Sequence, residues 1–266
     1  MRKLIFFDID GTIITEDEQE RIIPDSVITC LNALHRNNHL CFINTGRAFA
    51  EIDDVIRALP FDGYICGCGT YITYQGKVLL ANTIPFSLGN ELIKDLDCCR
   101  LEWVLEGTDA VYYSPLPYTT RIGNFKAEHQ KLLPEFSRTI TLKETHNLAF
   151  DKFCICLKKD SDFETFFQKY QNVLTFIDRG NDFYEVVPKG FSKASGISFL
   201  EDYFQIPNED TIAIGDSTND LTMLNYAGYS IAMANGSKEI FDYADYITDS
   251  VLNNGIYNAM QHLALI

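Results

Sequence analysis

The feature that most constrains this chain is the segment Lys3–Thr12, KLIFFDIDGT, in which an apolar run leads directly into two aspartates. The run Leu4–Phe7 contains no polar residue, which is typical of a strand buried on both faces of a parallel sheet. Ligands of open α/β sheets bind beyond the carboxyl ends of the strands, so Asp8 and Asp10 are predicted to lie at a binding edge. Two carboxylates this close repel each other, and a cation between them or a proton on one would relieve the repulsion.

Composition limits the classes of protein that this chain can belong to. Its 266 residues, of which 46% are hydrophobic, are typical of a globular protein with one or two domains. The formal net charge of −15 argues against a general nucleic-acid-binding surface. No apolar stretch reaches the roughly 18–20 residues of a membrane-spanning helix, and the run before Asp8 is too short for a signal peptide. We therefore expect a cytoplasmic protein with no nucleic-acid or membrane partner.

The eight cysteines are consistent with that compartment. The pairs Cys66/Cys68 and Cys154/Cys156 skip one residue, whereas zinc sites usually skip two to four. Because alternate residues of a strand share a face, these cysteines are expected to be reduced side chains that pack in the core. A redox or metal role is the alternative.

Strand-like runs alternate with helix-like runs over the first 80 residues, and the pattern returns near the C-terminus. His39–Asn44 and Thr211–Gly215 are predicted to be buried strands, and Phe49–Leu59 is predicted to be an amphipathic helix. Between them lies a stretch of short strand-like and helix-like patches. We predict a doubly wound α/β core with a mainly parallel sheet, interrupted by an inserted α+β domain. The predicted ranges are 1–81 and 189–266 for the core and 82–188 for the insertion.

Polar residues gather in segments that follow a predicted strand or begin a predicted helix. These segments are Asp8–Thr12, Asn44–Arg47, Phe191–Gly196 and Gly215–Asp220. They supply several carboxylates, a hydroxyl group and a lysine. Magnesium prefers oxygen ligands and commonly binds through a few carboxylates and a substrate phosphate. Phosphoryl transfer requires neutralisation of the charge on the phosphate oxygens, which these groups can provide.

The motifs DIDGT, NTGR, GFSKASG and GDSTND resemble, in this order, those of the haloacid dehalogenase superfamily. Within it, the chain resembles the Cof-type phosphatases, which carry a large α/β cap of the C2 type. The resemblance spans nearly the whole chain and includes the tail segment that begins IAMANGSKEI. It implies a Rossmann-like core, a cap that closes over the substrate and sets specificity, and Mg²⁺ as the cofactor.

The resemblance also implies a role for individual residues. Asp8 corresponds to the nucleophile that forms an aspartyl-phosphate, and Asp10 to the general acid and base, whose backbone carbonyl also binds the metal. The remaining implied roles are phosphate or substrate binding for Thr45, Gly46, Lys193 and Asn219, metal binding for Asp8, Asp10 and Asp216, and support for Thr12, Arg47 and Asp220.

Some of these roles have a structural alternative. Arg47 could contact phosphate, but an arginine at a helix start is as often a salt-bridge partner. Asp220 could be a helix-capping carboxylate instead of part of the metal site. The chain also departs from the family pattern at Cys66–Gly69 and at Ala234–Gly236, where the family often has Asn-Gly and Gly-Asn. These departures concern loops around the pocket and therefore the substrate contacts.

The sequence therefore predicts a magnesium-dependent phosphomonoester hydrolase that acts on a small phosphorylated metabolite. Sugar phosphates are the expected class through the resemblance alone. A phosphohexomutase that returns the phosphoryl group to a sugar is one alternative, and a non-catalytic sugar-phosphate-binding regulator is another. A monomer or a weak homodimer is expected.

Overall fold

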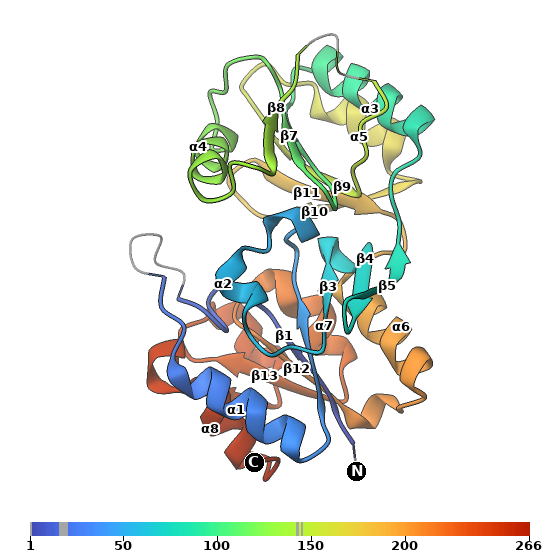
Figure 1. Cartoon of the computed structure of the whole chain (residues 1–266). Helices are drawn as coiled ribbons and strands as arrows, with labels where there is room; N and C mark the ends of the chain where they lie inside the picture. Colours follow the sequence, from blue (N-terminus) through green and yellow to red (C-terminus); the bar gives the residue numbers. More distant parts are fainter. Residues whose placement is uncertain (1, 16–20, 142–143, 145) are drawn as a thin grey trace. The chain divides into compact units, whose positions relative to one another are not determined.

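The computed structural model describes residues 2–15, 21–141, 144 and 146–266. The chain divides into two compact units, and Figure 1 colours both along the sequence. The first unit contains Met1–Gly46, Arg57–Leu79 and Ser192–Ile266, and the second contains Arg47–Ile56 and Leu80–Phe191. The segment Arg47–Ile56, which lies within the predicted core range, therefore groups with the second unit.

The sheet of the first unit has the strand order β14-β13-β12-β1-β2-β3-β4-β5. Neighbours from β14 to β3 are parallel, whereas β3 and β4 are antiparallel. The chain order reverses on either side of β1, which makes β1 the switch point of a doubly wound sheet. The predicted fold class is confirmed. The strands are β1 (Leu4–Phe7), β2 (Leu40–Asn44), β3 (Gly63–Cys66), β4 (Tyr71–Tyr74), β5 (Lys77–Ala81), β12 (Thr211–Gly215), β13 (Tyr229–Met233) and β14 (Tyr246–Thr248).

Helices of the first unit cover this sheet, and they are α1 (Asp25–Arg36), α6 (Lys193–Phe204), α7 (Leu221–Tyr226) and α8 (Gly255–His262). Helix α1 packs against α8, and α6 packs against α7. Right-handed crossovers place these two pairs on opposite faces of the sheet. Every side chain of β1 is consequently buried, as its apolar run predicts. None of the helices in the described ranges is long and apolar enough to cross a membrane.

The prediction of one helix over Phe49–Leu59 is wrong. The structure has a 3₁₀ turn at Phe49–Glu51 and a short helix α2 at Asp54–Arg57. The Glu51 carboxylate accepts a hydrogen bond of 2.6 Å from the backbone N–H of Ala48, and Ile52 is extended. The apolar spacing in this stretch reflects the burial of two separate turns.

The second unit contains a six-stranded sheet with the order β10-β11-β9-β6-β7-β8. Leu92, Trp103 and Phe166 belong to an apolar cluster that joins the sheet to α3 and α5, and Ile122 of α4 belongs to a separate cluster. The helices are α3 (Phe86–Cys98), α4 (Ile122–Leu132) and α5 (Phe163–Tyr170). The strands are β6 (Glu102–Glu106), β7 (Val111–Tyr113), β8 (Ser137–Thr139), β9 (Lys152–Cys156), β10 (Leu174–Asp178) and β11 (Phe183–Pro188).

A buried group of charges lies on three adjacent strands of this second sheet. Lys152 Nζ lies 2.6 Å from Glu106 Oε2 and 2.5 Å from Glu185 Oε1, and all three side chains are buried. Burial, followed by the charge of Glu106, raises the pKa of Glu51 in the same unit to about 8. An ammonium between two carboxylates compensates part of the cost of removing these charges from water.

Candidate active site

The predicted site begins where three neighbouring strands end. Phe7 of β1 lies opposite Ile43 of β2 and Ile214 of β12 in the parallel register. The residues that follow, including Asp8 after β1 and Asp216 after β12, therefore leave the sheet at the same edge. The register thus brings together segments that are about two hundred residues apart in the chain.

A fully buried lysine connects two of the predicted aspartates. Lys193 Nζ lies 2.7 Å from Asp8 Oδ1 and 2.5 Å from Asp220 Oδ1. The lysine is 1% exposed, Asp8 3% and Asp220 0%. These ion pairs are shielded from water, so removal of one partner would leave an uncompensated charge in the interior.

A capping box at the helix start and a hydrogen bond from Asn44 fix Lys193 at the first position of α6. Ser192 caps the helix, because its hydroxyl accepts the N–H of Ser195 at 3.1 Å and its own N–H donates to Ser195 Oγ at 2.9 Å. Asn44, at the end of β2, donates to the backbone carbonyl of Lys193 at 3.0 Å. Asn44 was part of the NTGR motif, but only the structure shows that it positions the lysine.

Asp220 also orders the loop that carries Asp216. Its Oδ2 accepts hydrogen bonds from the N–H groups of Asp216 at 2.9 Å and Ser217 at 3.1 Å. Each oxygen of Asp220 is therefore engaged, one by the lysine and the other by the backbone. This arrangement fits the supporting role that the resemblance implies for Asp220.

The loop after β1 passes close to Asp216. Gly11 has a φ of +70°, and a Cβ at this position would collide with Asp216 Oδ2. Asn235 donates to the carbonyl of Gly11 at 2.8 Å and accepts the N–H of Val251 at 3.0 Å. In the sequence, Asn235 is only part of a departure from the family pattern, and its contact with this loop is visible in the structure alone.

The other departure lies beside the start of α6. Gly69 has a φ of +91°, and a Cβ there would lie 2.5 Å from the backbone oxygen of Ser192. The Cys66–Gly69 loop thus approaches the backbone that precedes Lys193. A glycine is required at position 69 by both its backbone conformation and this close approach.

Three buried carboxylates provide a fitting site for a divalent cation. One oxygen from each of Asp8, Asp216 and Asp220 lies within 4.8 Å of the others. If all four groups were ionised, these three carboxylates and the ammonium of Lys193 would carry a net charge of two negative units. An all-oxygen set of this charge suits magnesium, which prefers carboxylate and water oxygens.

The electrostatics of this group favour a bound cation. Burial, followed by the charge of Asp220, raises the pKa of Asp8 to about 7, although Lys193 acts in the opposite direction. Burial lowers the pKa of Lys193, but the Asp220 and Asp8 carboxylates outweigh it and raise the pKa above the usual range. The lysine is therefore an ammonium at neutral pH, while Asp8 needs further positive charge to remain fully ionised.

Two predicted residues lie in the loop directly after Asp8. Asp10 is half-buried and forms an isolated bridge with Ile14, and its charge contributes to the raised pKa of Asp8. Thr12 is fully buried, and its hydroxyl has no hydrogen-bond partner among the described residues. Their roles in acid–base chemistry and in support of the site stay predictions.

The NTGR and GDSTND motifs supply the remaining residues. Thr45 is buried after β2, and its N–H donates to the Ile65 carbonyl at 2.9 Å; Gly46 follows it. Asn219 is half-buried and accepts a hydrogen bond from Ser217 Oγ. Arg47 belongs to the second unit, where its Nη1 lies 3.9 Å from Asp53 Oδ2, as expected of a salt-bridge partner.

Comparison with known proteins shows which proteins this chain is similar to in sequence and fold. The model of the haloacid dehalogenase-like hydrolase family matches residues 5–260. A putative phosphatase of Bacillus subtilis (strain 168), YkrA, is 29% identical over 99% of this chain and 98% of its own length. Two solved structures are each 26% identical. BT1666 of Bacteroides thetaiotaomicron, a phosphatase of the same superfamily, has a TM-score of 0.84 over 100% of this chain and 96% of its own. The subclass IIB sugar phosphatase BT4131 has a TM-score of 0.81 over 99% and 100%.

The raised pKa of Asp8 predicts how this residue affects stability. The pKa rises from 3.8 to about 7 on folding, so the folded state holds the proton more tightly than the unfolded chain. This stabilising contribution is complete below the unfolded pKa and is lost as the pH rises through the folded one. In magnesium-free buffer, the free energy of unfolding of the wild type should therefore fall as the pH rises from the unfolded to the folded pKa of Asp8. Asp8→Asn removes the titrating group and should reduce this fall by on the order of a few kcal/mol.

Urea denaturation at a series of pH values measures this effect. Asp242→Asn, which changes an exposed carboxylate, is the matched control and should follow the wild type. The interpretation is wrong if the wild type and Asp8→Asn lose stability in parallel as the pH rises.

Proposed function

Because this chain belongs to the haloacid dehalogenase-like hydrolase family and is a Cof-type phosphatase, we propose that it hydrolyses phosphate monoesters through an aspartyl-phosphate on Asp8. The observation that carries the proposal is the buried contact of Lys193 with Asp8 and Asp220, beside Asp216. The Asp8 carboxylate is paired with the ammonium of Lys193. It also lies at the edge of the sheet where ligands bind.

In the first step, an oxygen of Asp8 attacks phosphorus and forms a new P–O bond. The bond between phosphorus and the ester oxygen breaks, and Asp10 donates a proton to the departing alkoxide. Lys193 Nζ holds Asp8 Oδ1, which leaves Oδ2 as the attacking atom. The substrate alcohol is released and the phosphoryl group remains on Asp8.

In the second step, water attacks the phosphorus of the aspartyl-phosphate. Asp10, now ionised, takes a proton from this water, and the bond between phosphorus and the Asp8 oxygen breaks. Inorganic phosphate leaves and both aspartates return to their initial states. One residue thus acts first as acid and then as base, which requires a carboxyl group that can exchange protons within the site.

Charge compensation comes from the lysine and the predicted cofactor. An ammonium has three N–H donors, and two of those of Lys193 point to Asp8 and Asp220. The third can donate to a phosphate oxygen. We propose that Asp8, Asp216 and the backbone carbonyl of Asp10 hold Mg²⁺, which would neutralise charge on the transferring phosphoryl group.

We propose a sugar phosphate or a similar small phosphorylated metabolite as the substrate. One structural neighbour of comparable length, BT4131, is described as a sugar phosphatase. The catalytic groups contact only the phosphate and the ester oxygen in this mechanism. They therefore do not select the sugar, and the substrate class rests on the relative.

Replacement of Asp8 by asparagine tests the covalent mechanism. The neutral amide is a poor nucleophile, so Asp8→Asn should lower turnover by roughly 10⁴-fold or more. The assay measures inorganic phosphate released from a panel of phosphorylated metabolites, with and without magnesium. Asp242→Asn is the control, and circular dichroism verifies folding. Substantial activity in Asp8→Asn would refute the covalent step, and an isomerised sugar phosphate in place of free phosphate would identify a mutase.

Replacement of Asp10 by asparagine tests the proton transfer. Loss of the general acid should harm substrates with poor leaving groups most. We expect kcat/KM for alkyl phosphates to fall roughly 10²-fold or more, with a smaller loss for p-nitrophenyl phosphate, whose leaving group needs little protonation. Equal losses for both substrates would remove Asp10 from this role.

Replacement of Asp216 tests the metal site. Asp216→Ala should raise the magnesium concentration that gives half-maximal activity by at least roughly tenfold, since removal of even an indirect metal contact has such an effect. Titration of activity with magnesium, in parallel with the Asp242→Ala control, measures this shift. An unchanged titration curve would exclude Asp216 as a ligand.

A further inference from the structure

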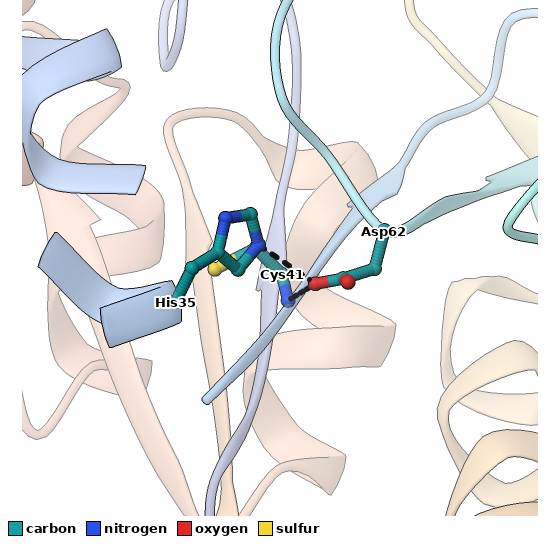
Figure 2. Close-up of side chains that lie close together, drawn as sticks. All are labelled: His35, Cys41 and Asp62. Carbon is teal, nitrogen blue, oxygen red and sulfur yellow. Dashed lines mark hydrogen bonds and ion pairs between the residues drawn. The ribbon is translucent and has the colours of Figure 1, made fainter. Parts of the chain in front are cut away.

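A second group of potential metal ligands lies in the first unit, outside the carboxylate site. It consists of His35 on α1, Cys41 on β2 and Asp62 directly before β3 (Figure 2). One ligand atom from each residue, the imidazole nitrogen, the thiol sulfur and a carboxylate oxygen, lies within 4.8 Å of the other two. Three segments that are separated in sequence therefore bring a nitrogen, a sulfur and an oxygen ligand close together.

The group is already partly ordered. His35 Nε2 lies 2.9 Å from Asp62 Oδ2, and the same oxygen accepts the backbone N–H of Cys41 at 2.8 Å. With metal–ligand bonds of about 2.0–2.3 Å, the donor atoms of a tetrahedral site are roughly 3.3–3.8 Å apart. Conversion to such a site would open the contact between His35 Nε2 and Asp62 Oδ2 by less than an ångström.

Burial of the three residues leaves an entry route on one side. Cys41 is fully buried, whereas the side chains of His35 and Asp62 are 32% and 14% exposed. An ion could therefore approach past the imidazole and the carboxylate and meet the sulfur at the inner end.

The position along β2 separates this group from the candidate active site. Cys41 is the second residue of the strand, whereas Asn44, which binds the Lys193 backbone, is the last. Three residues of a strand span about 10 Å. The His35 group thus lies toward the amino end of β2, and the carboxylates lie beyond its carboxyl end.

We propose that His35, Cys41 and Asp62 form a binding site for a divalent transition metal of the zinc class. A set of one imidazole, one thiolate and one carboxylate suits zinc, whereas magnesium and calcium prefer oxygen ligands alone. Such an ion would join α1, β2 and the residue before β3, and would stabilise the fold because the unfolded chain lacks the assembled site.

The thiol is inert without a metal. Burial, followed by the charges of Asp62 and Cys30, raises the pKa of Cys41 well above its usual range. A bound ion must therefore displace the thiol proton, which favours ions with high affinity for sulfur. The proposal does not depend on the proposed catalytic mechanism, because no residue of this group takes part in it.

Cobalt(II) provides a readout that the active-site carboxylates cannot produce. A cobalt–thiolate bond gives an intense charge-transfer absorption in the near ultraviolet, whereas carboxylate and water ligands do not. Titration of the full-length protein with Co²⁺ in mildly alkaline buffer should give this band with saturation at one equivalent per chain. Addition of zinc should then remove it by displacing the cobalt.

Two variants and one control assign the band. Cys41→Ser should abolish it, while Cys156→Ser, which changes another buried thiol on a strand in the second unit, should retain it. In case Cys41→Ser does not fold, His35→Asn changes a partly exposed ligand; it should weaken cobalt binding by more than the roughly 10- to 100-fold typical of an outer-shell change.

Thermal stability gives an independent measurement. Zinc should raise the melting temperature of the wild type and of Cys156→Ser by more than that of His35→Asn, in which only the carboxylate site remains. The proposal is overturned if the wild type shows no thiolate band, if the band survives in His35→Asn with unchanged affinity, or if zinc shifts the melting temperatures of the wild type and His35→Asn equally.

Discussion

The buried ammonium of Lys193 makes the ion pairs on which the geometry of the proposed active site depends. It lies between the carboxylates of Asp8 and Asp220, and almost no water reaches any of the three groups. Through these pairs, the end of β1, the start of α6 and the loop after β12 are bound to one positive charge. Charges removed from water are costly unless they are paired, so each of these segments constrains the other two. The side chain of Asp8, the proposed nucleophile, is therefore held in place by these ion pairs.

The sheet determines where this charge cluster can form. Because β1 is flanked in parallel by β2 and β12, the segments after all three strands leave the sheet at one edge. Gly11 lets the first of these segments pass against Asp216, and Asn235 holds it there. Burial in this cluster, followed by the negative charge of Asp220, raises the pKa of Asp8. Such a site is less stable by itself than it would be with a cation, and this trade of stability for function is common at active sites.

Sequence patterns were sufficient to predict the secondary-structure elements that are strongly apolar or that end in a motif. The strand Thr211–Gly215 has the predicted bounds, and the strand predicted at His39–Asn44 spans Leu40–Asn44. The prediction failed at Phe49–Leu59 because the Glu51 carboxylate accepts the N–H of Ala48 and caps a separate first turn, which ends at the extended residue Ile52. Hydrophobic spacing records which side chains are buried, but it does not record whether one helix or two turns bury them. The bond from Asn44 to Lys193 was equally invisible, since it joins residues on different elements.

What the sequence determined by itself is the chemistry: two aspartates after a buried strand, a lysine at a helix start and two more aspartates after another strand, in an order that is typical of the haloacid dehalogenase superfamily. These features are local, because they depend on residue type and on short spacings. The tertiary structure decided which of these groups share one charge, how far burial shifts their pKa values, and that His35, Cys41 and Asp62 meet at the other end of β2. Desolvation and electrostatic coupling act through space, so they exist only once the strands and helices are packed together.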